Sequence, residues 1–194
     1  SGWLRGEGID CIAMNVNDLF CVGAEPIAFV DYIAVPKTEP EVHAELGRSL
    51  SEGCRQARVT LAGGETATLP GIVTELDLSG TALGWFPKGG EITGERLEPG
   101  DSVIGLPSNG IHSNGYTLVR AVLKRSGLSL DDAAPFDAGG DRIVRWTEGE
   151  VTIGEVLLNP TMIYVNPVID LVLACREGTG PCSSEDIKVI AHIT

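Results

Sequence analysis

A short glycine-rich segment carries the residue types that most clearly suggest chemistry. We expect a strand over residues 59–63 to end at Gly63 and Gly64, directly before Glu65 and Thr66. Glycine lets the backbone approach a ligand closely, while the carboxylate and the hydroxyl can face a metal ion or a phosphate. Taken alone, the segment also fits an ordinary glycine-rich turn with a solvated glutamate, so its interpretation depends on the other motifs.

Asn17 and Asp18 form a second polar motif, near the end of a helix that apolar spacing predicts over residues 9–23. At about 100° per residue, Asp18 lies roughly opposite the apolar stripe. Its carboxylate is a hard oxygen ligand, which suits magnesium or a magnesium-bound water. Asn17 can orient a phosphate or a water. The alternatives are a solvated helix acid for Asp18 and a polar helix-edge residue for Asn17.

The third motif runs from His112 through Ser113 and Asn114 to Gly115, at the start of a helix expected to end near residue 125. Helix N-terminal amides attract anions, so this loop is the candidate contact for a substrate phosphate or amide. His112 can also donate a hydrogen bond or move a proton near neutral pH. The alternative is a loop histidine that caps the backbone.

Composition excludes several classes of protein. The net charge of −13 argues against general nucleic-acid binding, although it leaves room for a small phosphorylated substrate held by amides or magnesium. No run of about 18 uncharged apolar residues exists, and nothing at the start resembles a signal peptide. The five cysteines form no CxxC pair and suit reduced, buried thiols. We therefore expect a cytoplasmic protein with no membrane contact.

Helical and strand patterns alternate along the chain, which indicates a mixed α/β class. A Pro-Lys-Gly-Gly break at residues 87–90 predicts two domains, 1–87 and 88–194. We expect a small α/β sandwich first and a larger one second. The expected strands are 27–35, 59–63, 72–86, 102–106 and 188–193, and the further expected helices begin with 38–57 and 113–125. Another helix can start at about residue 159, and Asn166-Pro167 either kinks that helix or starts a new one, with the apolar pattern continuing to residue 175. Residues 129–150 are an expected surface excursion.

Three segments in order carry a family resemblance: residues 13–19 with Gly-Ala-Glu-Pro at 23–26, residues 63–67 with Pro-Gly at 70–71, and residues 110–120. Together they resemble the phosphoribosylformylglycinamidine cyclo-ligases, or aminoimidazole ribonucleotide synthetases, of purine biosynthesis. The resemblance implies a two-domain ATP-binding fold whose N-terminal sheets pair into a dimer barrel. It also implies an ATP-dependent enzyme that phosphorylates the amide oxygen of formylglycinamidine ribonucleotide and then closes the imidazole ring. The implied cofactors are ATP and magnesium (Mg2+).

The resemblance also implies roles for individual residues. It places Asp18 and Glu65 on magnesium, and it gives catalytic roles to these two and His112. The implied nucleotide contacts are Asn17, Gly63, Gly64 and Thr66, and the implied contacts to the phosphoribosyl substrate are His112, Ser113, Asn114, Gly115 and Thr161. His192 matches a family position near the active site, but a core histidine explains it equally well.

Two further expectations follow from the same resemblance. The strands at 27–35 and 72–86 are more apolar than a sheet covered by two helices needs, which fits a homodimer formed through them. The family's Asp-Gly-Val-Gly-Thr-Lys loop would precede residue 1, so the expected nucleotide site is incomplete in this sequence. The alternatives are a related ATP-dependent enzyme, such as formylglycinamidine ribonucleotide synthetase, selenophosphate synthetase or thiamine-monophosphate kinase, or a non-catalytic dimerising module.

Overall fold

The first half of the chain forms one sheet backed by two helices. The computed structural model describes residues 2–137, 143, 145 and 147–193. Strand β1 (Glu25–Val35) lies at the centre of the sheet, between β2 (Thr60–Thr68) and β3 (Asp77–Trp85). It pairs in parallel with β2 and antiparallel with β3. The mixed α/β class is confirmed.

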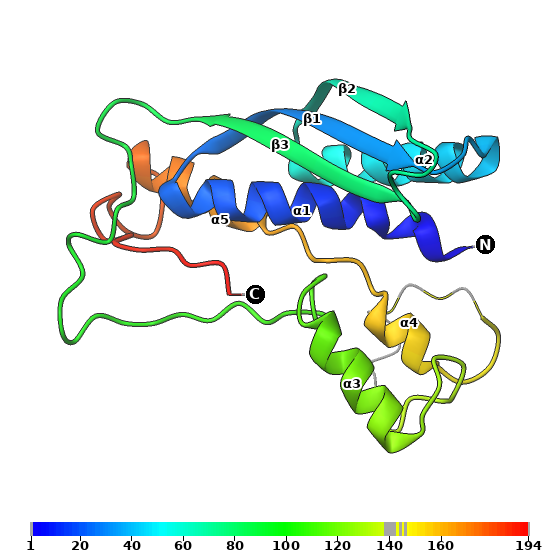
Figure 1. Cartoon of the computed structure of the whole chain (residues 1–194). Helices are drawn as coiled ribbons and strands as arrows, with labels where there is room; N and C mark the ends of the chain where they lie inside the picture. The colour runs from blue at the N-terminus through cyan, green and yellow to red at the C-terminus, as the bar shows by residue number, and fades with distance from the viewer. Residues whose placement is uncertain (1, 138–142, 144, 146, 194) are drawn as a thin grey trace.

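Helices α1 (Glu7–Leu19) and α2 (Pro40–Ala57) cover a single face of this sheet (Figure 1). The short 3-10 helices η1 (Gly2–Arg5) and η2 (Phe20–Val22) flank α1, and the left-handed Gly23 ends this run. The two long helices pack closely because Gly8 faces the backbone of α2: a Cβ there would lie 2.4 Å from the amide nitrogen of Leu50. On the opposite face of the sheet, the described residues place no helix (Figure 1).

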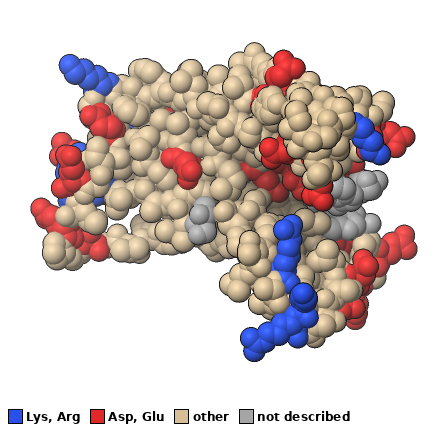
Figure 2. Space-filling view, in the orientation of Figure 1, with Lys and Arg blue, Asp and Glu red and all other residues tan. Residues whose placement is uncertain are grey.

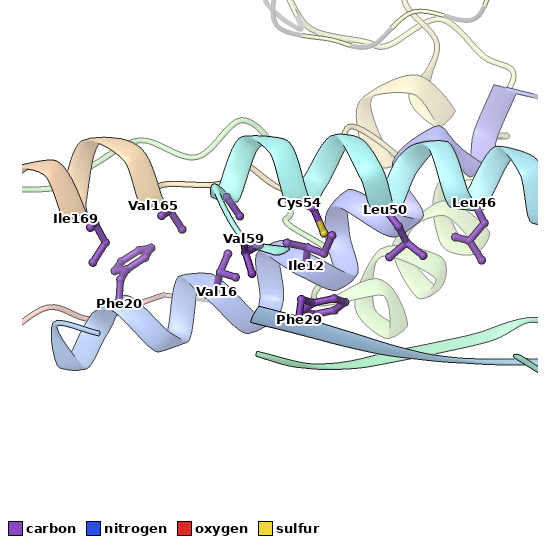
Figure 3. Packing of buried hydrophobic residues seen from close by; sticks show 11 residues of the cluster. Ile12, Val16, Phe20, Phe29, Leu46, Leu50, Cys54, Val59, Val165 and Ile169 are labelled. Atoms are coloured by element: carbon purple, nitrogen blue, oxygen red, sulfur yellow. The ribbon is translucent and has the colours of Figure 1, made fainter. Parts of the chain in front are cut away.

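The hydrophobic core lies between these helices and the sheet (Figure 3). Phe29 of β1 is fully buried against side chains from both helices. Helix α5 (Val165–Arg176) adds Val165 and Ile169 to the same cluster. The late part of the chain therefore packs into the core of the first half, and the predicted division at residues 87 and 88 stays a prediction.

Between β3 and α5 the chain is mostly extended and carries two further helices, α3 (Tyr116–Ser126) and α4 (Ile153–Leu157). The strands expected at 102–106 and 188–193 are absent, so the larger second sandwich is not formed by the described residues. A strand needs a hydrogen-bonded neighbour. After Trp85, the described residues provide one isolated bridge, between Ala133 and Thr152, and Val103 is 95% exposed.

Several helix boundaries differ from the sequence prediction. Helix α1 ends at Leu19, before the expected Gly23, and α3 begins at Tyr116, after the expected residue 113. Of the two late starts that the sequence left open, near residue 159 and at Asn166-Pro167, the structure has the second, because α5 begins at Val165. Helix α4 was not predicted. Its signal was present, because Thr152 and Glu155 form a capping box in which each side chain bonds the other's backbone. The expected excursion at 129–150 includes residues 138–142, 144 and 146, which lie outside the described residues. Within the described ranges, no helix has the length and apolar character needed to cross a membrane.

Candidate functional site

Polar side chains of α1 form hydrogen bonds with the backbone of residues 161–164, which lie far away in the sequence. Asn17 is fully buried, and its amide nitrogen donates to the carbonyl oxygen of Met162 at 2.9 Å. Its amide oxygen accepts from the backbone nitrogen of Tyr164 at 3.1 Å. Seven residues earlier on the same helix, the carboxylate of Asp10 accepts from the backbone nitrogen of Thr161 at 2.7 Å. Asn17 is therefore not the helix-edge residue that the sequence offered as the alternative to a nucleotide contact, because both ends of its amide hold the backbone of residues 162 and 164.

The loop before α3 has an uncommon backbone conformation. His112 and Ser113 both have positive φ, 49° and 59°, although neither is glycine, and Gly115 follows at 73°. Such left-handed residues cost about 1–3 kcal/mol each and concentrate at functional sites. The expected first turn of the helix is thus not helical, because Gly115 caps α3 and the motif precedes it.

Hydrogen bonds from neighbouring segments hold this loop in its strained form. The Nε2 of His112 lies 2.5 Å from Oδ1 of Asn109, whose amide nitrogen donates to the carbonyl of Pro160. Asn114 donates from its side chain to the carbonyl of His112 at 2.8 Å. The hydroxyls of Ser113 and Thr161 lie 3.2 Å apart. The predicted substrate contacts, from two separate segments, therefore come together in one place.

His112 is held in an environment that favours its neutral form. Burial is the main cause that lowers its pKa, and the nearby His192 lowers it further, while Asp10 acts in the opposite direction. The ring packs at a tilt against Tyr164, with 6.1 Å between centroids. A neutral imidazole can both donate and accept a hydrogen bond, which suits positioning of a polar ligand.

Asp18 and His192 form an ion-pair contact beneath the end of α1. The Nδ1 of His192 lies 2.9 Å from Oδ1 of Asp18. The Asp18 side chain is 70% exposed, as its place on the helix predicted, whereas that of His192 is 7% exposed. The Nε2 of His192 is buried without a hydrogen-bond partner among the described residues. Family resemblance was the single sequence signal for His192, because a pairing across 174 positions leaves no local pattern.

Glu65 lies on the other side of the sheet from Asp18. Strand β2 does not end at the two glycines but continues to Thr68, so the motif is part of a strand and not a loop. Glu65 pairs with the exposed Tyr32 of β1, and cross-strand partners share a face. This is the face without helices. The expectation that the two carboxylates converge within one chain is therefore not met.

Because side chains alternate along a strand, Gly63 lies on the uncovered face with Glu65, whereas Gly64 and Thr66 lie on the helix-covered face. Gly64 pairs with Asp31, and a Cβ on Gly64 would lie 2.3 Å from the Asp31 carboxylate, so this glycine is required for packing. A Cβ on Gly63 would meet nothing within 4 Å, which leaves that position open to a ligand. Thr66 pairs with Ile33, which packs against the core, and so belongs to the helix-covered face.

An acidic cleft of about 490 Å³ lies beside Ser113, between α1 and the start of β3. Its lining includes the carboxylates of Glu7, Asp10 and Asp77 and no lysine or arginine among the described residues. Burial, followed by the charge of Asp10, raises the pKa of Glu7. Across the part of the chain that the structure describes, no group of three or more His, Cys, Asp and Glu side chains is placed to hold a metal ion.

Comparisons with known proteins identify the relatives of this chain. Residues 4–86 match the AIR synthase related protein family in its N-terminal domain, and residues 98–194 match the C-terminal domain of the same family. The chain is 46% identical over 96% of its length to a phosphoribosylformylglycinamidine cyclo-ligase of Methanosarcina mazei, of which it covers 50%. It is 44% identical over 96% of its length to the enzyme of that name from Thermococcus kodakarensis, of which it covers 48%.

The solved structures add evidence on the fold alone. A thiamine-monophosphate kinase from Stenotrophomonas maltophilia aligns with a TM-score of 0.55 and 22% identity, over 87% of this chain and 46% of that one. The chain spans about half the length of the curated relatives that it matches. Since the two domain matches together account for nearly all of its residues, the chain belongs to the AIR synthase related protein family.

Proposed function

We propose that the protein containing this chain catalyses the ATP-dependent cyclisation of formylglycinamidine ribonucleotide to aminoimidazole ribonucleotide, a step of purine biosynthesis. The observation that carries the proposal is the identity of 44–46% over 96% of the chain to proteins named phosphoribosylformylglycinamidine cyclo-ligase. The strained loop at His112 and Ser113 adds structural support, because such a conformation persists only where neighbouring contacts impose it.

The loop of residues 112–115 and Thr161 is the proposed contact for the phosphoribosyl substrate. Two hydroxyls meet there, on Ser113 and Thr161, beside a neutral histidine. Figure 2 shows one group of basic side chains over α3, the helix that follows this loop and carries Lys124 and Arg125 in its last turn, with other basic side chains at the left and right edges of the drawn face. These charges lie at the far end of α3, whereas the N-terminal amides of the same helix face the loop and favour an anionic group on a chain whose net charge is −13.

The acidic cleft next to Ser113 suits the opposite end of such a substrate. An amidine is a strong base and carries a positive charge near neutral pH. Glu7, Asp10 and Asp77 line the cleft and can offset that charge while the phosphate lies toward the loop. The proposed substrate would thus place its phosphate at the loop and its cationic amidine in the acidic cleft, which fixes its orientation.

Magnesium and ATP fit part of the described residues. Bound together, they would supply the phosphoryl group that activates the amide oxygen. Asp18 offers a largely exposed carboxylate, one oxygen of which contacts His192. Because the described residues place no three ligand groups together, the remaining ligands would come from nucleotide, water or another chain. Glu65 and Gly63, on the uncovered face, could join Asp18 only across an interface between two chains.

We infer a homodimer formed through the uncovered face of the sheet. The apolar side chains of Val30, Tyr32, Leu83 and Trp85 are 40–60% exposed there. Alternation along β1 and β3 places these four on the side away from α1 and α2. A contiguous apolar face of this kind usually marks a protein interface. Pairing two copies would cover this apolar face.

The test is a direct assay of the full-length protein. Formylglycinamidine ribonucleotide, ATP and magnesium are supplied, and aminoimidazole ribonucleotide and ADP are measured together. Equal formation of both products supports the proposal. ADP formation with thiamine monophosphate and none with the ribonucleotide would instead favour the kinase whose fold the chain shares.

Asp18→Asn in the full-length protein tests the metal assignment separately. Since the side chain is mostly solvent-exposed, we expect an unchanged melting temperature. Turnover should fall at least tenfold, because a neutral amide is a poorer ligand for a hard cation. Near-normal turnover at limiting magnesium would remove Asp18 from the metal site while leaving the reaction itself untouched.

A further inference from the structure

Two cysteines outside the proposed site are in direct contact. Cys175 lies in the last turn of α5 and is buried, whereas Cys182 lies on the following loop and is exposed. Their Sγ atoms are 3.3 Å apart, and both thiols are free. The exposed sulfur is open to reagents in solution, and the buried one is within its reach.

The backbone of the intervening turn holds the two sulfurs together. The amides of Thr179 and Gly180 both donate to the carbonyl of Ala174, at 2.9 and 2.8 Å, and Gly178 adopts a left-handed conformation with φ of 72°. A Cβ on Gly180 would lie 2.7 Å from the sulfur of Cys175. The turn therefore folds the chain back over the buried thiol of Cys175 and brings the thiol of Cys182 into contact with it.

We propose that Cys175 and Cys182 are a modification site that forms a reversible disulfide by exchange with a small disulfide such as oxidised glutathione. The Cys182 thiolate attacks one sulfur of that disulfide and releases one thiolate of the reagent. The Cys175 thiolate then attacks the Cys182 sulfur, closes the intramolecular bond and releases the second. Two protein thiols are oxidised, one reagent disulfide is reduced, and the two thiol protons pass to the two released thiolates.

The geometry and the charge state set the conditions for this exchange. A disulfide needs its sulfurs at about 2.0 Å, so the exposed Cys182 side chain has to approach by about 1.3 Å from the contact distance. The hydrogen-bonded contact with Cys175 is the main cause that raises the pKa of Cys182. Because the thiolate is the attacking species, the exchange should accelerate as the pH rises above neutrality.

The position of the pair gives its oxidation a structural effect. Arg176, next to Cys175, donates from its guanidinium to the carbonyls of Gly23 and Gly90. The end of α5 is thereby tied to the end of η2 and to the segment after β3. A disulfide would close a loop of eight residues at this junction. Chain-entropy arguments for a loop of that size lead us to expect a rise in melting temperature of about 5 °C.

Peptide mapping gives a direct test on the whole protein. The protein is incubated with oxidised glutathione at pH 8, free thiols are alkylated, and trypsin is added. Trypsin cuts after Arg145, Arg176 and Lys188, so the disulfide would join peptide 146–176 to peptide 177–188. We expect this linked pair, its separation on reduction, and the rise in melting temperature in the same oxidised sample.

Three variants make the outcome decisive. Cys182→Ser should lose both the linked peptides and the temperature shift, while Cys21→Ser should retain them. Cys175→Ala should leave Cys182 trapped as a mixed disulfide with glutathione, because no second thiol can displace it. A stable mixed disulfide at Cys182 in the protein without substitutions would overturn the proposal. A link between Cys182 residues of two molecules would do so as well.

Discussion

Replacing Asn17 by leucine separates two roles that this residue can have. The sequence suggested a nucleotide contact, whereas the structure shows an amide that is fully buried and bonded at both ends to the backbone of Met162 and Tyr164. Leucine has a similar volume and also suits a helix, so the packing of α1 changes little. The variant mainly removes the two hydrogen bonds.

The expected loss of stability follows from the groups left behind. The carbonyl of residue 162 and the amide of residue 164 would both lose their partner in a partly buried place. Each unsatisfied group costs about 1–3 kcal/mol, so the free energy of unfolding should fall by about 2–6 kcal/mol. For a chain of this size, that corresponds to a melting temperature lower by about 4–24 °C.

Thermal melting and urea unfolding measure this effect, with Asn15→Leu as the matched control. Asn15 is on the same helix, but its side chain bonds only the carbonyl of Cys11 one turn earlier. We expect the control to change stability by less than about 1 kcal/mol. If Asn17→Leu melts like the unmodified protein but binds ATP more weakly, then the positioning role is wrong and the nucleotide contact is right.

Three further predictions test packing, assembly and charge. Gly8→Ala should destabilise by about 1–3 kcal/mol in urea unfolding because its Cβ meets the α2 backbone, whereas Gly47→Ala, with nothing within 4 Å, should be neutral or stabilising; equal effects would refute the close packing. Val30→Lys on the uncovered face should give a monomer mass by light scattering, whereas Leu118→Lys on α3 should leave a dimer. Burial lowers the pKa of His112, so the unfolded chain binds its proton first as the pH falls below about 6.5. Melting temperature should therefore decrease from pH 7 toward pH 5.5, and less steeply for His112→Gln; parallel curves for the two proteins would contradict this.

The elements that the sequence predicted well are those that find their partners nearby. The apolar spacing of α1 and α2 and the apolar runs expected as strands at 27–35 and within 72–86 correspond to elements that pair and pack within the first half. The exposure of Asp18 followed from the same helical period. Local pattern was sufficient there because burial on one side of each element is all that the pattern encodes.

The errors arose where distant segments decide the outcome. Gly63 and Gly64 were predicted to end a strand. Strand β1 instead pairs with both glycines and continues to pair with β2 as far as Val35 and Thr68, so pairing overrides the low strand preference of glycine. The apolar run at 102–106 looked like a strand but has no described neighbour with which to pair. The structural role of Asn17 was missed, because its hydrogen-bond partners lie 145 and 147 positions away and leave no local pattern.

Helix α1 connects the fold to the proposed site. Its apolar face forms the core with the sheet and α2, and its polar face carries Asp10, Asn17 and Asp18. The first two fix the backbone at 161–164, and Thr161 in turn meets Ser113 in the strained loop. Contacts that begin in the core thus offset the cost of the left-handed residues at 112 and 113. It follows that a core substitution in α1 should disturb the loop at 112–115, the proposed substrate contact, even where it leaves every residue of that loop unchanged.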